Sequence, residues 1–137
     1  VYICTDLLKT VIMKKLKLVF VLLMSMVFTS CFHEDNFGYP KTIVLSNEGG
    51  EKTVTGDESF DYAEIVNHKT GADSEVVQYD ENGEVIVLDW LKVEYTRTNS
   101  LEFKLYAEPN STGKSRELCV ELYSGKYYHE VKVKQEK

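Results

Sequence analysis

This 137-residue sequence has few cysteines. Its three cysteines are Cys4, Cys31 and Cys119, and only Cys119 follows residue 31. Small exported domains that rely on disulfides usually carry an even-numbered cysteine framework. That framework is excluded for the part of the chain after Cys31, so its fold must be held by an apolar core. Cys119 lies within an alternating apolar stretch, and we interpret it as a small packed side chain rather than a reactive thiol.

Basic residues are also outnumbered by acidic ones, with 16 Lys and Arg against 22 Asp and Glu. Residues 1–30 contribute +3 to the net charge of −6, so the remainder of the chain carries −9. Proteins that bind nucleic acids need Lys and Arg clustered against the phosphates. We therefore expect no nucleic-acid partner.

The sequence lacks the motifs that accompany catalysis or metal binding. Its histidines are His33, His68 and His129, and no nucleophile elbow or glycine-rich oxyanion loop stands near them. The segment 80–84 offers oxygen ligands, but it lacks the spacing of a twelve-residue calcium loop. No two Cys or His residues stand at the spacing of a zinc site. The sequence thus predicts no catalytic residues, no enzyme activity, no metal and no cofactor.

Helical periodicity is missing from the whole segment after Cys31. Short strand-like runs separated by turn residues take its place, and Asn82-Gly83 is typical of a hairpin turn with positive φ. Residues 85–88 are apolar on both sides, which suits a central strand. Such a series of strands predicts an all-β, immunoglobulin-like β-sandwich over residues 42–137. The expected strands are 42–45, 52–55, 61–66, 75–79, 84–89, 91–95, 101–107, 117–123 and 128–135.

Alternation within the later strands predicts which side chains face the core. Leu101, Phe103, Leu105 and Ala107 share one parity, and charged residues occupy the other. Trp90 shares the parity of the apolar residues at 86 and 88, so we expect it in the core. By the same reasoning, residues 117 and 121 are expected to form cross-strand ion pairs with residues 132 and 134.

The N-terminal residues have the pattern of an export signal. Basic residues at 14, 15 and 17 precede the apolar run Leu18–Phe28, and Thr29-Ser30-Cys31 follows it. A transmembrane helix needs about 20 apolar residues, so this run is too short to be a stable membrane span. We interpret residues 1–30 as a signal peptide. Residues 1–12 have no place in it, which indicates either a start assigned too far upstream or an unusually long basic region, and we favour the first.

The sequence Val27-Phe28-Thr29-Ser30-Cys31 resembles the lipobox of bacterial lipoproteins. This resemblance implies cleavage before Cys31 and lipid on that cysteine, and two or three acyl chains give a stable membrane anchor. Residues 31–41 would then form the lipidated cysteine and a tether. The acidic pair Glu34-Asp35 resembles a surface-export signal of Bacteroidetes lipoproteins. We expect a location at the outer membrane, either exposed at the surface or facing the periplasm.

The second half of the chain resembles the BACON domain. The resemblance rests on Asp89-Trp90-Leu91-Lys92-Val93, on the strand at 101–105, on Pro109-Asn110 followed by Arg116, and on the closing segment 131–135. Upstream, the segment 49–54 is similar to the Gly-Gly turn and strand that open that module. BACON modules are immunoglobulin-like sandwiches of Bacteroidetes proteins with a presumed role in carbohydrate binding. The resemblance implies a non-catalytic binding module.

Tyrosine is abundant, with nine residues, and it gives the candidate binding residues. Alternation turns Tyr106, Tyr123 and Tyr128 away from the core, and on neighbouring strands they would form an aromatic strip. Such a strip could stack on sugar rings or on a partner protein. The alternative is that the tyrosines simply pair across strands on a wet sheet face. We expect a carbohydrate-binding lipoprotein, with a structural or adhesive component of an envelope complex as the alternative.

Overall fold

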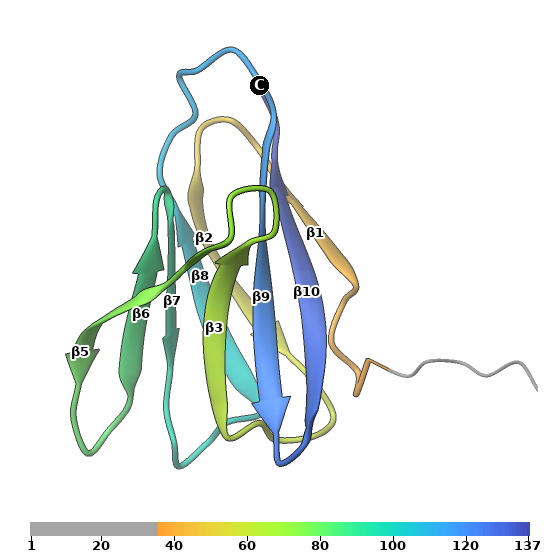
Figure 1. Cartoon of the computed structure of the whole chain (residues 1–137), viewed down its shortest axis with the longest axis vertical. Coiled ribbons are helices and arrows are strands. Elements are labelled where there is room, and N and C mark those ends of the chain that lie inside the picture. The colour runs from red at the N-terminus through yellow and green to blue at the C-terminus, as the bar shows by residue number, and fades with distance from the viewer. Residues whose placement is uncertain (1–35) are drawn as a thin grey trace, which may run out of the picture. The chain divides into compact units, whose positions relative to one another are not determined.

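The computed structural model describes residues 36–137, and within them every regular element is a β-strand. Two five-stranded sheets lie face to face (Figure 1). Sheet A has the strand order β1-β10-β9-β3-β4, and sheet B has the order β2-β8-β7-β6-β5. The strands are β1 (Thr42–Leu45), β2 (Gly50–Thr55), β3 (Tyr62–Asn67), β4 (Ala72–Asp73), β5 (Glu75–Tyr79), β6 (Glu84–Leu88), β7 (Leu91–Tyr95), β8 (Glu102–Ala107), β9 (Arg116–Ser124) and β10 (Tyr127–Gln135). The predicted all-β sandwich is confirmed.

All nine expected strands are present, with shifts of no more than two residues at their ends. The two-residue strand β4, which pairs with the end of β3, was not expected, because its residues lie in a turn-like sequence. The predicted central strand at 85–88 is β6, which lies between β5 and β7. β1 runs parallel to β10, and the other pairings are antiparallel.

The core fills the space between the sheets with the residues that alternation turns inward. Trp90 is 7% exposed and belongs to this core, as predicted. Burying an aliphatic or aromatic side chain of this size stabilises the fold by about 1.5–3 kcal/mol. Side chains with almost no exposed surface are Phe103, Ile65, Ile86, Leu91, Leu105, Leu118, Leu122, Val93, Val120, Val131 and Val133. They come from both sheets, so the two layers share a single core.

Residues 36–41, assigned to the tether from sequence, contact the sandwich. Tyr39 is 4% exposed and donates its hydroxyl proton to the carbonyl of Glu58 at 2.7 Å. The ring of Phe37 lies edge-on to His129, with 3.9 Å between ring centroids. A β-carbon on Gly56 would come within 2.3 Å of the Tyr39 ring, so glycine makes room for it. The folded unit therefore begins before Thr42.

The hairpin between β5 and β6 lies where Asn82-Gly83 predicted it, but its geometry differs. Neither residue has a positive φ. Instead, the Asp80 carboxylate accepts hydrogen bonds from the backbone N–H groups of Asn82, at 2.8 Å, and Gly83, at 3.1 Å. Gly83 is required for another reason, because a β-carbon there would lie 2.3 Å from the carbonyl oxygen of Tyr95. A longer loop closed by an aspartate thus replaces the two-residue turn.

Candidate functional site

Three rows of side chains cross the outer face of sheet A, because β3, β9 and β10 are paired in register. The aromatic row consists of Tyr62, Tyr123 and Tyr128. The carboxylate row next to it consists of Glu64, Glu121 and Glu130, and a third row consists of Val66, Cys119 and Lys132. Residues two apart on a strand point to the same face, so each row lies directly beside the next.

The rings of the aromatic row stack on one another. Tyr62 and Tyr123 are nearly parallel, with centroids 4.6 Å apart and planes at 5°. Tyr128 continues the stack at 5.7 Å and 29°. Because the ring faces meet within the row, the stack turns mainly ring edges outward. The end rings Tyr62 and Tyr128 are 42% and 57% exposed, and each has one face that no described ring contacts.

The carboxylate row places like charges on neighbouring strands. Glu121 is opposite Glu64 on one side and Glu130 on the other. Glu121 is only 8% exposed, and its carboxylate accepts a 2.5 Å hydrogen bond from the Tyr123 hydroxyl. This hydrogen bond, together with burial, raises the pKa of Tyr123. Like charges directly opposite destabilise a sheet, so this row needs compensation.

His68 supplies part of that compensation from the turn that follows β3. Its Nε2 atom lies 3.0 Å from Oε2 of Glu130 and 3.6 Å from Oε1 of Glu121. The imidazole is half exposed, with 52% of its side chain accessible. It therefore bridges two strands at the surface of the sheet.

The predicted ion pairs of β9 are correct in one case and wrong in the other. Lys134 pairs with Glu117 at 3.5 Å. Glu121 does not face Lys132, because the register places Cys119 opposite that lysine. The strand pattern gave the correct face for Glu121, whereas the register that selects its neighbours is a property of the paired sheet.

Cys119 is buried, as its place in an apolar strand predicted. Its thiol is hydrogen-bonded with Glu130. Burial, and then the charge and hydrogen bond of Glu130, raise the pKa of Cys119 to about 11. The protonated thiol is therefore the stable form at neutral pH, which disfavours a role as a nucleophile.

The structure brings together two of the three predicted tyrosines. Tyr123 and Tyr128 are direct cross-strand neighbours. Tyr106 is not part of the strip, because β8 pairs with β2 and β7 in sheet B. Its hydroxyl donates to Glu94 at 3.0 Å, and the ammonium of Lys92 lies 4.0 Å from its ring centroid.

Sequence reasoning missed Tyr62, the third ring of the row. Its strand alternates in the expected way and shows that Tyr62 faces outward. What the alternation does not show is that β3 is the neighbour of β9. His68 was likewise set aside, because its relation to Cys119 and Glu130 exists only in the folded sheet.

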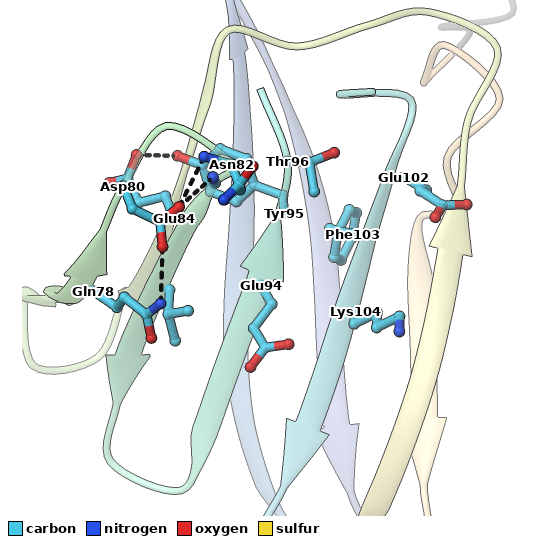
Figure 2. Close-up of a pocket in the computed structure, with 12 residues that line it drawn as sticks. Gln78, Asp80, Asn82, Glu84, Glu94, Tyr95, Thr96, Glu102, Phe103 and Lys104 are labelled. Atoms are coloured by element: carbon cyan, nitrogen blue, oxygen red, sulfur yellow. Dashed lines mark hydrogen bonds between the residues drawn. The ribbon is translucent and has the colours of Figure 1, made fainter. Parts of the chain in front are cut away.

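Sheet B has an open groove of about 330 Å³ beside the β5–β6 turn. Figure 2 shows Asp80 and Asn82 on one side of this groove and Glu102 and Lys104 on the other. Burial disfavours the charged form of Glu94, but hydrogen bonds from Lys92 and Tyr106 outweigh it and leave its pKa below the ordinary value.

Asp80, at the rim of the groove, has a lowered pKa because of hydrogen bonds from the side chain of Gln78 and from the turn backbone. Glu84 accepts a 2.8 Å hydrogen bond from the buried hydroxyl of Tyr95. A carboxylate with a lowered pKa, as at Asp80 and Glu94, is poorly suited to donate or accept a proton near neutral pH. These acids therefore serve the local structure of the turn and sheet.

Cys31, the predicted lipidation site, lies outside the described residues, as does the whole predicted signal peptide. Within residues 36–137, no helix has the length and apolar character needed to cross a membrane.

Comparison with known proteins gives a likeness of fold. No family model matches the sequence, and no curated protein matches it at a significant level. A solved NMR structure of a protein from Bacteroides thetaiotaomicron is similar, with a TM-score of 0.50 and 19% sequence identity. The match covers 72% of this chain and 81% of that one. At this identity the likeness shows the shared fold alone.

Proposed function

We propose that this chain is an outer-membrane lipoprotein, anchored through lipid on Cys31, whose sandwich binds carbohydrate without catalysing a reaction. The anchor is supported by the apolar run at 18–28 and the lipobox-like sequence that ends at Cys31. The resemblance to the BACON domain supports the same proposal from sequence alone. In this arrangement the sandwich is presented either at the cell surface or toward the periplasm.

The carbohydrate site of this proposal is the Tyr128 end of the aromatic row. Tyr128 is 57% exposed and has a ring face that no described ring covers. A sugar ring has an apolar C–H face that can pack on an aromatic ring, and its hydroxyls can donate to carboxylates. Glu130 stands in the neighbouring carboxylate row, and His68 is hydrogen-bonded to it at 3.0 Å. Their side chains are 38% and 52% exposed. The open ring face beside exposed polar groups is the observation that carries the proposal.

Binding at this surface should be weak for one molecule. The face is open rather than pocketed, so little of a ligand would be removed from water. Many copies anchored in one membrane would raise the overall strength, because the second contact with the same polysaccharide becomes intramolecular. A single-site dissociation constant in the high micromolar to millimolar range is consistent with this arrangement.

A glycan array probed with the full chain in detergent tests the proposal. Tyr128→Ala should weaken binding about thirtyfold or more, since an aromatic that anchors a ligand contributes upward of about 2 kcal/mol. Tyr106→Ala is the matched control, because it removes an outward tyrosine from the opposite sheet. If the Tyr128→Ala and Tyr106→Ala variants lose glycan binding to the same extent, the site lies elsewhere.

A structural or adhesive role is the second candidate, and the edge strand β5 favours it. All five of its residues are exposed, and Val76, Val77 and Tyr79 are 55%, 59% and 61% exposed. Exposed apolar side chains on a sheet edge are typical of protein contacts. If the folded protein binds no glycan on the array, this second function is preferred.

A further inference from the structure

Three side chains with different metal-binding atoms meet on the outer face of sheet A. They are His68, Cys119 and Glu130, and their ligand atoms all lie within 4.8 Å of one another. They come from the turn after β3, from β9 and from β10, and 51 residues separate His68 from Cys119. We propose that these three residues bind a divalent transition-metal ion, with zinc the best fit and Glu121 within reach as a fourth ligand.

The distances are close to those of a tetrahedral site. Zinc bonds of about 2.0–2.3 Å place neighbouring ligand atoms roughly 3.3–3.8 Å apart. Nε2 of His68 lies 3.6 Å from Glu121, which is within this range, and 3.0 Å from Glu130, which is slightly short of it. Because the thiol lies within 4.8 Å of the other atoms, an adjustment of about 1 Å completes the set. His68 is half exposed and on a turn, so it has room to make this adjustment.

The charge around the cluster independently favours a cation. Glu64, Glu121 and Glu130 are aligned on three neighbouring strands, and Glu121 is 8% exposed. Within residues 36–137, His68 is the only basic side chain at ion-pair distance from Glu121 or Glu130. A half-exposed imidazole is a small compensation for carboxylates in this arrangement. A bound divalent ion would remove the repulsion by taking both carboxylates as ligands.

The kind of ligand atom selects the metal. Calcium and magnesium prefer all-oxygen sites, whereas a thiolate and an imidazole favour zinc and its neighbours in the transition series. Binding releases the thiol proton of Cys119 to solvent, because the thiolate is the ligand. With three protein ligands the ion keeps an open position for water, and with Glu121 it becomes a closed structural site.

Cobalt(II) substitution tests the site directly. The full chain, purified in detergent and stripped with chelator, should bind one Co²⁺ and show thiolate-to-cobalt charge transfer with the intense visible bands of tetrahedral coordination. His68→Gln should weaken Zn²⁺ binding by more than about tenfold in competition with a chromogenic chelator, since even indirect partners of a metal contribute that much. Cys119→Ser should abolish the charge-transfer band, although other cysteines remain in the chain.

Glu117→Gln is the matched control, because Glu117 lies on β9 and faces outward two residues from Cys119. Glu117→Gln should leave the affinities for Co²⁺ and Zn²⁺ unchanged. His68 is exposed, so its variant is expected to fold even if Cys119→Ser does not, and circular dichroism verifies this. No uptake by the wild-type protein, or equal uptake by the His68 variant, would overturn the proposal. The metal site shares His68 and Glu130 with the proposed carbohydrate site. The two proposals are still tested separately, since Tyr128→Ala should weaken glycan binding and spare cobalt uptake.

Discussion

Gln135 offers a sharp test of how one end of the sandwich is held together. Its side chain is completely buried at the end of β10. The amide nitrogen donates to the carbonyls of Ser46, at 3.1 Å, and Glu108, at 2.9 Å. The amide oxygen accepts from Nε of Arg116 at 2.8 Å, and the same guanidinium lies 4.6 Å from the ring of Trp90. One amide thus ties β10 to two loops and to β9.

Gln135→Leu keeps roughly the same volume and removes all three hydrogen bonds. The carbonyl of Glu108 keeps a partner, because Arg116 also donates to it at 3.0 Å. The carbonyl of Ser46 keeps the backbone N–H of Gly49 as a donor, at 3.2 Å. Nε of Arg116 loses its partner. Each unsatisfied group costs about 1–3 kcal/mol, and the added apolar burial offsets part of this. The free energy of unfolding should therefore fall by about 1–3 kcal/mol.

Urea unfolding followed by the fluorescence of Trp90, the only tryptophan, measures this change. Lys134→Gln on the opposite face of β10 is the matched control and should lower stability by less than about 1 kcal/mol. The loss in the double variant Arg116→Met with Gln135→Leu should be smaller than the sum of the two single losses, because the residues share a bond. A Gln135→Leu protein within about 0.5 kcal/mol of wild type would refute the reasoning.

Two further predictions concern Tyr39 and Cys31. Burial, together with the charge of Asp57, raises the pKa of Tyr39 to about 12 from the ordinary 10.0, so its contribution to stability is complete below pH 10 and is lost as the pH rises toward 12. In the Tyr39→Phe variant, the free energy of unfolding measured with urea should fall less steeply with rising pH in this range than in the wild type. The same pH dependence in both proteins would contradict the raised pKa of Tyr39. For Cys31, mass spectrometry of the mature protein should show an acylated N-terminal cysteine without residues 1–30, and Cys31→Ser should leave the precursor uncut. A water-soluble, unmodified mature protein would count against the anchor.

The class of fold and the buried side of each strand follow from local patterns in the sequence. Alternation is a local property of the pleated backbone, so Phe103 and Leu105 could be assigned to the core without knowing which strands are neighbours. The same parity placed Trp90 inside and Tyr128 outside. Turn positions were equally local, although at Asn82-Gly83 the hydrogen bonds of Asp80 produced a different turn from the expected one.

Which outward residues meet depends on how the strands pair in the folded protein. Sheet membership and register depend on pairing between distant segments, and period-two patterns are the same for every possible pairing. That is why Tyr106 was grouped with Tyr123 although it lies in the other sheet, and why Tyr62 was missed. The approach of His68 to Cys119 has the same origin, because β3 and β9 become neighbours only when the sheet forms.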